Sequence, residues 1–194
     1  MILYYSPGAC SMADHIALNE AGLAHDLVKV DLRAKQTAGG DDFWQINPKG
    51  YVPALALDSG ELLTENVAIM TWIASQAPGV AAKGELAQIR TIETLTYIST
   101  ELHKQFGVLF QGGTDEAKAT ARERITKRLS LLAPRVQDGY LFGPEFTVAD
   151  AYLFTVLSWC KKVGVDLADP FPAYYDRMAA RDAVKRSLQE EGLA

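Results

Sequence analysis

A cysteine follows the first apolar segment of the chain, at a position where a thiol can be reactive. Residues 2–5 have the composition of a strand, Pro7-Gly8 interrupts it, and Cys10 stands at or just before the start of a helix. The first backbone N–H groups of a helix lack partners within the helix, and the helix dipole favours an anion there. We therefore expect the pKa of the Cys10 thiol to be depressed and its sulfur to be nucleophilic. The alternative from spacing alone is an inert thiol at a helix start.

No second cysteine is placed to resolve a disulfide at Cys10. In a thioredoxin-like arrangement the partner cysteine stands three residues away, where this chain has Ala13 and Pro7, so an intramolecular dithiol cycle is excluded. Cys160 falls in an apolar helical segment and is expected to be inert. Without a CxxC motif or a Cys/His cluster we expect no metal, and free thiols favour a cytoplasmic protein.

Two further segments carry groups suited to binding a polar ligand. Val52-Pro53 precedes a predicted strand, and an X–Pro bond is the one place where a cis peptide is accessible, although an ordinary trans turn is the alternative. Glu65-Asn66 opens a predicted helix, where polar side chains and free N–H groups form an anion site suited to a carboxylate. The alternative is simple helix capping by Thr64.

The first part of the chain alternates short strands with helices. A strand, a helix and a second strand within about thirty residues are typical of a βαβ crossover with parallel strands. The next two strands are separated by Asp58-Ser59-Gly60, which predicts an antiparallel hairpin, and a helix follows that ends before Pro78. The expected strands are 2–5, 27–30, 54–57 and 62–63, the first helix is 11–21, and 33–47 is expected to be a loop with one short helix.

The second part is predicted to be all-helical, because its apolar residues recur at three- and four-residue steps. Thr147 with Asp150 forms a variant of the capping box. The fold class is therefore α/β plus all-α: residues 1–78 form the first domain, 79–82 a linker, and 83–194 a helical domain. The expected helices are 83–110, 115–138 and 148–163, followed by one or two that open at Pro170 and Pro172.

Composition narrows the class of protein. The 194 residues are 48% hydrophobic and 22% charged, which is the balance of a globular protein with a substantial core. No apolar run reaches the roughly 18 residues of a membrane span, and the first residues lack the basic segment of a secretory signal. A formal net charge of −5 makes nucleic acids and acidic membranes unexpected partners.

Several motifs in order resemble the glutathione transferase superfamily, and the resemblance covers nearly the whole chain. Two shorter segments resemble its bacterial beta class, whose active-site residue is a cysteine. The superfamily motifs are Asn47-Pro48-Lys49-Gly50, Val52-Pro53-Ala54-Leu55, residues 63–69 and residues 146–150, and the beta-class segments are 4–11 and 99–104.

The resemblance implies a thioredoxin-like first domain, with Cys10 facing the sulfur of glutathione and His103 near it. Val52, before cis-Pro53, would pair with the cysteinyl backbone, Glu65 and Asn66 would hold the γ-glutamyl end, and Lys35 would meet the glycine carboxylate. Where this chain has Asn66 and Thr96 the family often has Ser and Asn. The implied glutathione-binding residues are Leu32, Lys35, Tyr51, Val52, Pro53, Glu65, Asn66, Thr96, Thr100 and Lys104.

Two alternatives to this assignment remain: a polar surface stripe that includes His103, and a different active-site residue in place of Cys10. Thr96, Thr100 and His103 share one helical stripe, which without the family match favours a solvated polar surface. With the match, His103 would stabilise a thiolate or donate a proton. Ser11, and less strongly Tyr5, rival Cys10, because other transferase classes use such residues nearby. His15 and His25 are expected at the surface.

We expect an enzyme, a homodimeric glutathione transferase that conjugates glutathione to apolar electrophiles and forms a mixed disulfide at Cys10. A glutaredoxin-like thiol transferase and a non-catalytic ligand-binding protein are the alternatives. The expected partners are therefore glutathione, a small hydrophobic electrophile and a second copy of the chain. The candidate electrophile wall is Phe106, Phe110, Tyr152 and Trp159, with simple core packing as the alternative.

Overall fold

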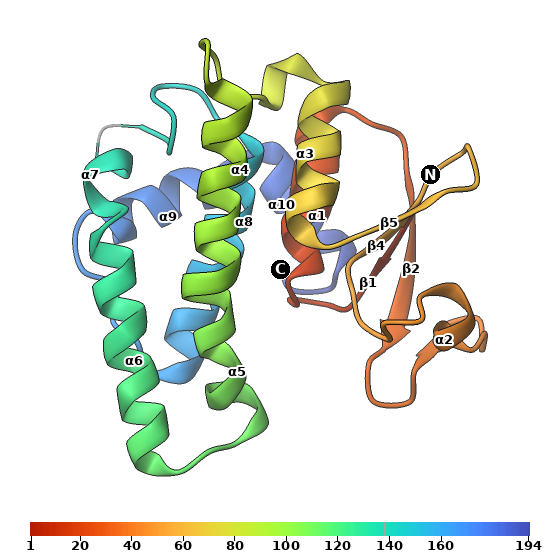
Figure 1. Ribbon diagram of the computed structural model, residues 1–194, viewed down its shortest axis with the longest axis horizontal. Helices are drawn as coiled ribbons and strands as arrows, with labels where there is room; N and C mark the ends of the chain where they lie inside the picture. Colours follow the sequence, from red (N-terminus) through yellow and green to blue (C-terminus); the bar gives the residue numbers. More distant parts are fainter. Residues whose placement is uncertain (138) are drawn as a thin grey trace.

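The computed structural model describes residues 1–137 and 139–194. Figure 1 shows a small sheet on one side of the molecule and a bundle of helices on the other. The sheet has five strands in the order β3-β2-β1-β4-β5; β1 and β2 are parallel, and the other neighbours are antiparallel. The strands are β1 (Ile2–Tyr5), β2 (Asp26–Asp31), β3 (Gln36–Thr37), β4 (Ala54–Ala56) and β5 (Leu62–Thr64).

The predicted crossover and hairpin are both confirmed. Helix α1 (Ser11–Ala21) connects the parallel strands β1 and β2 and ends at Gly22, whose φ of 65° is the left-handed conformation that glycine adopts without strain. The loop expected over 33–47 contains the short helix α2 (Phe43–Ile46), opened by Asp42, whose side chain accepts from Trp44 N. It also contains the strand β3, which has two residues and is therefore too short to be predicted from hydrophobic periodicity.

The long helix expected over 83–110 begins later, at Ala87, and runs to Gln111 without a break but with a change of helix type. Helix α3 (Asn66–Gln76) and a 3₁₀ turn, η1 (Pro78–Val80), lead into α4 (Ala87–Tyr97). A π-helical segment, η2 (Ile98–His103), separates α4 from α5 (Lys104–Gln111). A π turn holds an extra residue and so rotates the side chains that follow it, and such segments are frequent at functional sites.

The remaining helices follow the predicted pattern with one change. The single helix expected over 115–138 is two, because α6 ends at a turn before α7, and residue 138 lies outside the described residues. The capping box of Thr147 and Asp150 is confirmed at the start of α8. The elements are α6 (Asp115–Ser130), α7 (Ala133–Val136), α8 (Val148–Cys160), η3 (Lys161–Val163), α9 (Phe171–Ala179) and α10 (Asp182–Glu190).

One hydrophobic core joins the sheet and the helices. Helix α1 packs against α3, α8 and α10, so that Met12 and Ile16 belong to the same buried cluster as Tyr152 and Leu153. A smaller cluster around Phe43 lies under α2. The architecture is thioredoxin-like at the N-terminus and all-helical afterwards, as predicted, while the linker at 79–82 stays a prediction. Among the described residues, no helix combines the length and apolar character that a bilayer crossing requires.

Candidate active site

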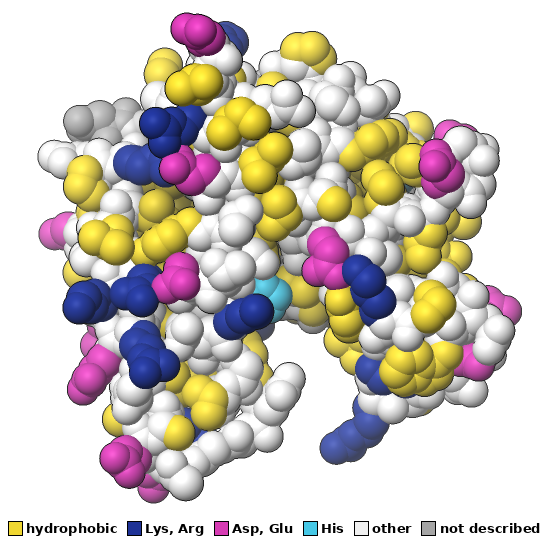
Figure 2. Space-filling model, viewed as in Figure 1, with side chains coloured by type: hydrophobic (Ala, Val, Ile, Leu, Met, Phe, Trp, Pro, Cys, Tyr) yellow, Lys and Arg dark blue, Asp and Glu magenta, His cyan; other side chains and the backbone are white. Residues whose placement is uncertain are grey.

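A cavity of about 610 Å³ lies where the sheet-bearing part meets the helices. Figure 2 shows this face hollowed between the two. Cys10, at the first turn of α1, and Val52, just before β4, contribute to one wall, and residues of η2, α5 and α8 form the other. The lining residues are Pro7, Gly8, Ala9, Cys10, Tyr51, Val52, Pro53, Glu65, Asn66, Val67, Ser99, His103, Lys104, Phe106, Gly107, Phe110, Gln111, Tyr152, Trp159 and Lys162.

The thiol of Cys10 is protonated at neutral pH, contrary to the expectation of a depressed pKa. Burial, followed by the charge of Asp14, raises the pKa of Cys10 to about 12, although backbone N–H groups at the helix start act in the opposite direction. The thiol donates a hydrogen bond to the carbonyl oxygen of Val52 across 3.3 Å. Desolvation therefore outweighs the helix terminus, because the thiolate would exchange solvating water for only a few backbone donors.

The loop before β4 presents its main chain to the cavity. The Val52–Pro53 peptide bond is cis, which confirms the prediction. Asn47 braces the loop, since its Nδ2 donates to Tyr51 O at 2.7 Å and its Oδ1 accepts from Lys49 N at 3.1 Å. A backbone stretch held in this way can pair with an extended peptide ligand.

Glu65 stands at the start of α3 with a φ of 73°, a conformation uncommon outside glycine. Its carboxylate pairs with the ammonium of Lys49 and accepts from the Tyr51 hydroxyl at 2.7 Å. Both contacts lower the pKa of Glu65, Lys49 more strongly. Thr64 does not cap α3; its hydroxyl accepts from Lys49 Nζ at 2.9 Å. Glu65 is therefore an ionised carboxylate at the cavity edge that already binds a primary ammonium.

Four of the predicted glutathione-binding residues lie outside the lining of this cavity in the single chain. The amino group of Lys35 donates to Gly50 O at 2.6 Å, and Leu32 packs on the cluster around Phe43. Thr96 and Thr100 are exposed on α4 and η2. These side chains are engaged or turned elsewhere, so their contact with a ligand stays a prediction.

His103 is neutral, so the expectation that it adds positive charge is wrong. Burial lowers the pKa of His103 to about 4, and its Nδ1 lies 2.7 Å from the hydroxyl of Tyr152. Burial likewise raises the pKa of Tyr152, which keeps the phenol protonated. Unlike Thr96 and Thr100, His103 does line the cavity. The predicted stripe of Thr96, Thr100 and His103 therefore does not act as one surface: His103, at the end of η2, lines the cavity, and the two threonines do not.

Aromatic side chains from α5 and α8 form the helical wall. The Trp159 ring lies 4.9 Å from His103, 5.3 Å from Phe106 and 5.9 Å from Phe110, measured between ring centroids. Trp159 Nε1 donates to Gly8 O at 2.8 Å, which ties this wall to the loop before Cys10. All four predicted electrophile-binding residues line the cavity, and Phe110 is half exposed, at 52%.

Both rivals to Cys10 face away from the cavity. The Ser11 hydroxyl is fully buried and bonds to the main chain of Ser6, while Tyr5 is part of the core. Cys160 is also fully buried, and burial raises the pKa of its thiol to about 12. Cys10 is accordingly the thiol that the cavity presents.

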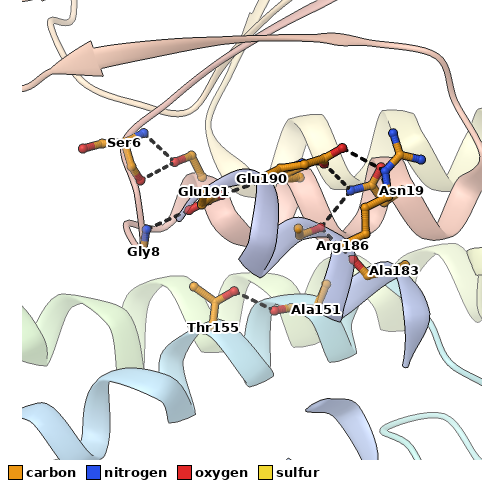
Figure 3. A network of polar contacts seen from close by, with 12 residues as sticks. Ser6, Gly8, Asn19, Ala151, Thr155, Ala183, Arg186, Glu190 and Glu191 are labelled. Carbon is orange, nitrogen blue, oxygen red and sulfur yellow. Dashed lines mark hydrogen bonds and ion pairs between the residues drawn. The ribbon is translucent and has the colours of Figure 1, made fainter. Parts of the chain in front are cut away.

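The prediction that His15 lies at the surface is wrong. The His15 ring is fully buried, 2.8 Å from Glu190 Oε2 and 3.0 Å from Glu191 Oε1, because α10 returns to pack on α1. Figure 3 shows the surrounding network, in which Gly8 N donates to Glu191 Oε2 at 2.7 Å. His25 is half buried, with its Nδ1 2.8 Å from Leu23 O.

Sequence reasoning missed several lining residues, and only one of them carried a usable signal. Gly8, with a φ of 67°, marks the tight turn that brings the main chain before Cys10 to the cavity, and a Pro-Gly pair is a recognisable turn signal. Lys162 adds an ammonium to the cavity from η3, where nothing in its neighbourhood indicated a site. The residues missed are Pro7, Gly8, Ala9, Val67, Ser99, Gly107, Gln111 and Lys162.

The described residues contain no group of three or more His, Cys, Asp or Glu side chains arranged to hold a metal ion. The cavity instead combines a polar wall, formed by a carboxylate and main-chain groups, with an apolar aromatic wall. Such a division suits a ligand with a peptide portion next to an apolar one.

Comparison with known proteins finds the same family along most of the chain. Residues 9–76 match the profile of the glutathione S-transferase N-terminal domain, and residues 88–182 match that of the C-terminal domain. The chain is 46% identical to glutathione S-transferase GstA of Escherichia coli O157:H7 over 200 residues, covering 100% of both proteins.

Solved structures show the same likeness. A bacterial beta class glutathione S-transferase from Sphingomonas chungbukensis is 46% identical, with a TM-score of 0.92 and 100% of each chain covered. A sphingomonad glutathione S-transferase complexed with glutathione has the same identity, TM-score and coverage. With both family profiles matched in order and full-length relatives at this identity, the chain belongs to the glutathione S-transferase family.

Proposed function

We propose that this transferase binds glutathione along the wall formed by residues 51–53 and 65–66 and conjugates its thiol to an apolar electrophile held by the aromatic wall. The observation that carries the proposal is the juxtaposition of these two walls around Cys10 in one cavity. Holding the two reactants side by side turns a bimolecular encounter into an oriented reaction. Relatives named as glutathione S-transferases support conjugation more strongly than a purely ligand-binding role or a glutaredoxin-like role.

Glu65 is the proposed receptor for the α-ammonium of the γ-glutamyl group. Its carboxylate already accepts hydrogen bonds from an ammonium and a phenol, which supports the assignment. The main chain of Val52 is proposed to pair with the cysteinyl unit, because Val52 lines the cavity together with Cys10 and Pro53. Asn66 contributes its side-chain oxygen, since both hydrogens of its Nδ2 are used by Cys10 O and Asp14 Oδ2.

The proposed stabilisation of the glutathione thiolate comes from donors and cations that face the cavity. The neutral S–H of Cys10 can donate to the thiolate sulfur if it turns away from Val52 O, and the N-terminus of α1 contributes its dipole. Lys104 and Lys162 place positive charge on the lining, whereas neutral His103 can only exchange hydrogen bonds. Donors preorganised for developing charge are the main source of such rate enhancements.

Replacing Glu65 tests the assignment. Glu65→Ala should raise the glutathione dissociation constant at least tenfold, because a hydrogen bond to a charged group contributes roughly 1.5–3 kcal/mol. Calorimetric titration measures the constant, and Glu61→Ala, at an exposed carboxylate whose one recorded contact is with Ser59, serves as control. An unchanged constant in Glu65→Ala would remove this residue from the site.

The proposed mixed disulfide between Cys10 and glutathione requires the Cys10 thiolate to attack oxidised glutathione, releasing one glutathione thiolate. With a thiol pKa near 12, this adduct should form slowly at pH 7 and faster as the pH rises. Intact mass spectrometry after incubation with oxidised glutathione detects it. Added mass that persists in Cys10→Ala, or that maps to Cys160, would assign the redox reaction elsewhere.

We also propose a homodimer in the cytoplasm. Leu86 and Ile89, at the start of α4, expose 57% and 62% of their surface, as expected of residues that a second copy covers. The two free cysteines suit a reducing compartment. Light scattering at micromolar concentration should give twice the chain mass of 21.2 kDa, and the mass of one chain would count against the dimer.

A further inference from the structure

A buried carboxyl group lies one helical turn beyond Cys10. Asp14 has no exposed surface, and its Oδ2 accepts from Asn66 Nδ2 at 2.7 Å. Its Oδ1 has no hydrogen-bond partner among the described residues. A buried polar atom without a hydrogen-bond partner lowers the stability of a protein by about 1–3 kcal/mol, so the presence of such an atom at Asp14 requires an explanation.

Asn66 connects this carboxyl group to Cys10. The same Nδ2 that donates to Asp14 also donates to Cys10 O at 2.9 Å. Cys10 and Asn66 both line the cavity, whereas Asp14 lies behind them. The three residues therefore form a chain of contacts from a buried acid to the backbone carbonyl of Cys10, the residue whose thiol lines the cavity. The chain joins the first turn of α1 to the first turn of α3.

The Asp14 carboxyl group affects the pKa of the Cys10 thiol electrostatically. Burial raises the pKa of Asp14 well above its usual range. Once the carboxyl group is ionised, its charge is the second cause, after burial, of the raised pKa of Cys10. Glu65 acts in the same direction more weakly. The other titratable groups that line the cavity around Cys10 are Tyr51, His103, Lys104, Tyr152 and Lys162.

We propose that Asp14 is a positioning residue for Cys10: through Asn66 it fixes the main chain at the start of α1, and its carboxyl group governs how readily the Cys10 thiol gives up its proton. The inference rests on the proposed function in taking Cys10 as the thiol of the site. Removing the charge while keeping the contact to Asn66 should make Cys10 more reactive.

Alkylation of Cys10 by iodoacetamide between pH 7 and pH 10 tests this. Asp14→Asn keeps a side-chain oxygen for Asn66 but carries no charge. We expect the alkylation rate of Cys10 at each pH to rise about tenfold, which corresponds to a fall of about one unit in its pKa. Peptide mass spectrometry separates Cys10 from Cys160, and Asp26→Asn, at an exposed position in β2, is the matched control.

Asp14→Ser is the second variant, with a small neutral side chain that can also accept from Asn66, and it should raise the alkylation rate of Cys10 in the same way. Unchanged alkylation rates in two variants that circular dichroism shows to be folded would overturn the proposal. Failure of both variants to fold would also overturn it, because Asp14 would then serve folding rather than Cys10. The assay contains no glutathione, so its outcome is independent of the Glu65 experiment.

Discussion

Two aspartates among the described residues, Asp14 and Asp150, are fully buried, and their surroundings differ sharply. Asp150, in the first turn of α8, has every oxygen occupied: Oδ1 accepts from Leu141 N at 2.8 Å and the Tyr174 hydroxyl at 2.9 Å, and Oδ2 accepts from the backbone N and hydroxyl of Thr147, both at 2.8 Å. Asp14, in α1, has one partner and one oxygen without any.

The comparison separates a group that holds the fold from a group that adjusts a site. Asp150 receives four donors from three segments, so its carboxylate connects the loop before α8 to α9. Burial raises the pKa of Asp150, and those donors act against that rise, whereas the pKa of Asp14 lies well above its usual range. A buried group that is poorly satisfied persists more readily at a functional site than elsewhere.

Asp150→Ala should have the largest effect on stability. It leaves four buried donors without an acceptor, and breaking a buried charged network lowers the free energy of unfolding by roughly 3–5 kcal/mol. Urea denaturation followed by circular dichroism measures the loss. A loss below about 1 kcal/mol would show that the donors find other partners and would remove the contrast with Asp14.

Matched asparagine variants compare the two positions directly. Asp150→Asn places an amide donor against existing donors and should lower the free energy of unfolding by about 2 kcal/mol. Asp14→Asn keeps its one accepting contact and should change stability by less than about 1 kcal/mol. Equal losses in the same denaturation experiment would contradict the division of roles.

Tyr174→Phe removes a single donor from Asp150 and sharpens the comparison further. The remaining three donors stay in place, so we expect a loss of about 1.5 kcal/mol, which is the lower range for a hydrogen bond to a charged group. Tyr175→Phe in the same helix, where no recorded hydrogen bond is lost, is the control. Similar losses in both variants would mean that the hydroxyl of Tyr174 contributes no more than an unbonded one.

The last prediction concerns the pH dependence of stability. The pKa of His103 is about 4 in the folded protein and 6.5 ordinarily, so between these values the unfolded chain binds more protons. The contribution of His103 to stability is therefore complete above about pH 6.5 and is lost as the pH falls towards 4. In denaturation at pH 7, 6 and 5, His103→Gln should lose less stability than the parent chain. Parallel curves would mean that His103 titrates alike in both states.

Sequence patterns over a few neighbouring residues were enough to predict several secondary-structure elements. The strand–helix–strand crossover, the hairpin turn at 58–60 and the Thr147 capping box are confirmed, because each depends on residues within a few positions of one another. The family motifs likewise placed Val52 and Glu65 on the cavity, and the expectation of an apolar electrophile singled out the four aromatic residues that line it. These features follow from local backbone preferences and from hydrophobic periodicity.

Burial and long-range contacts were decided only by the tertiary structure. The sequence placed Cys10 at a helix start, but the packing around it desolvates the thiol and so reverses the expected direction of its pKa. His15 became a buried residue because α10, more than 160 positions later, packs on α1. The partners of Asp14 and Glu65 arose in the same way, from segments brought together by the fold. The physical reason is that the free energy of a charge depends on all the atoms around it, whichever part of the chain supplies them, whereas a helix or a turn forms mainly from its own residues.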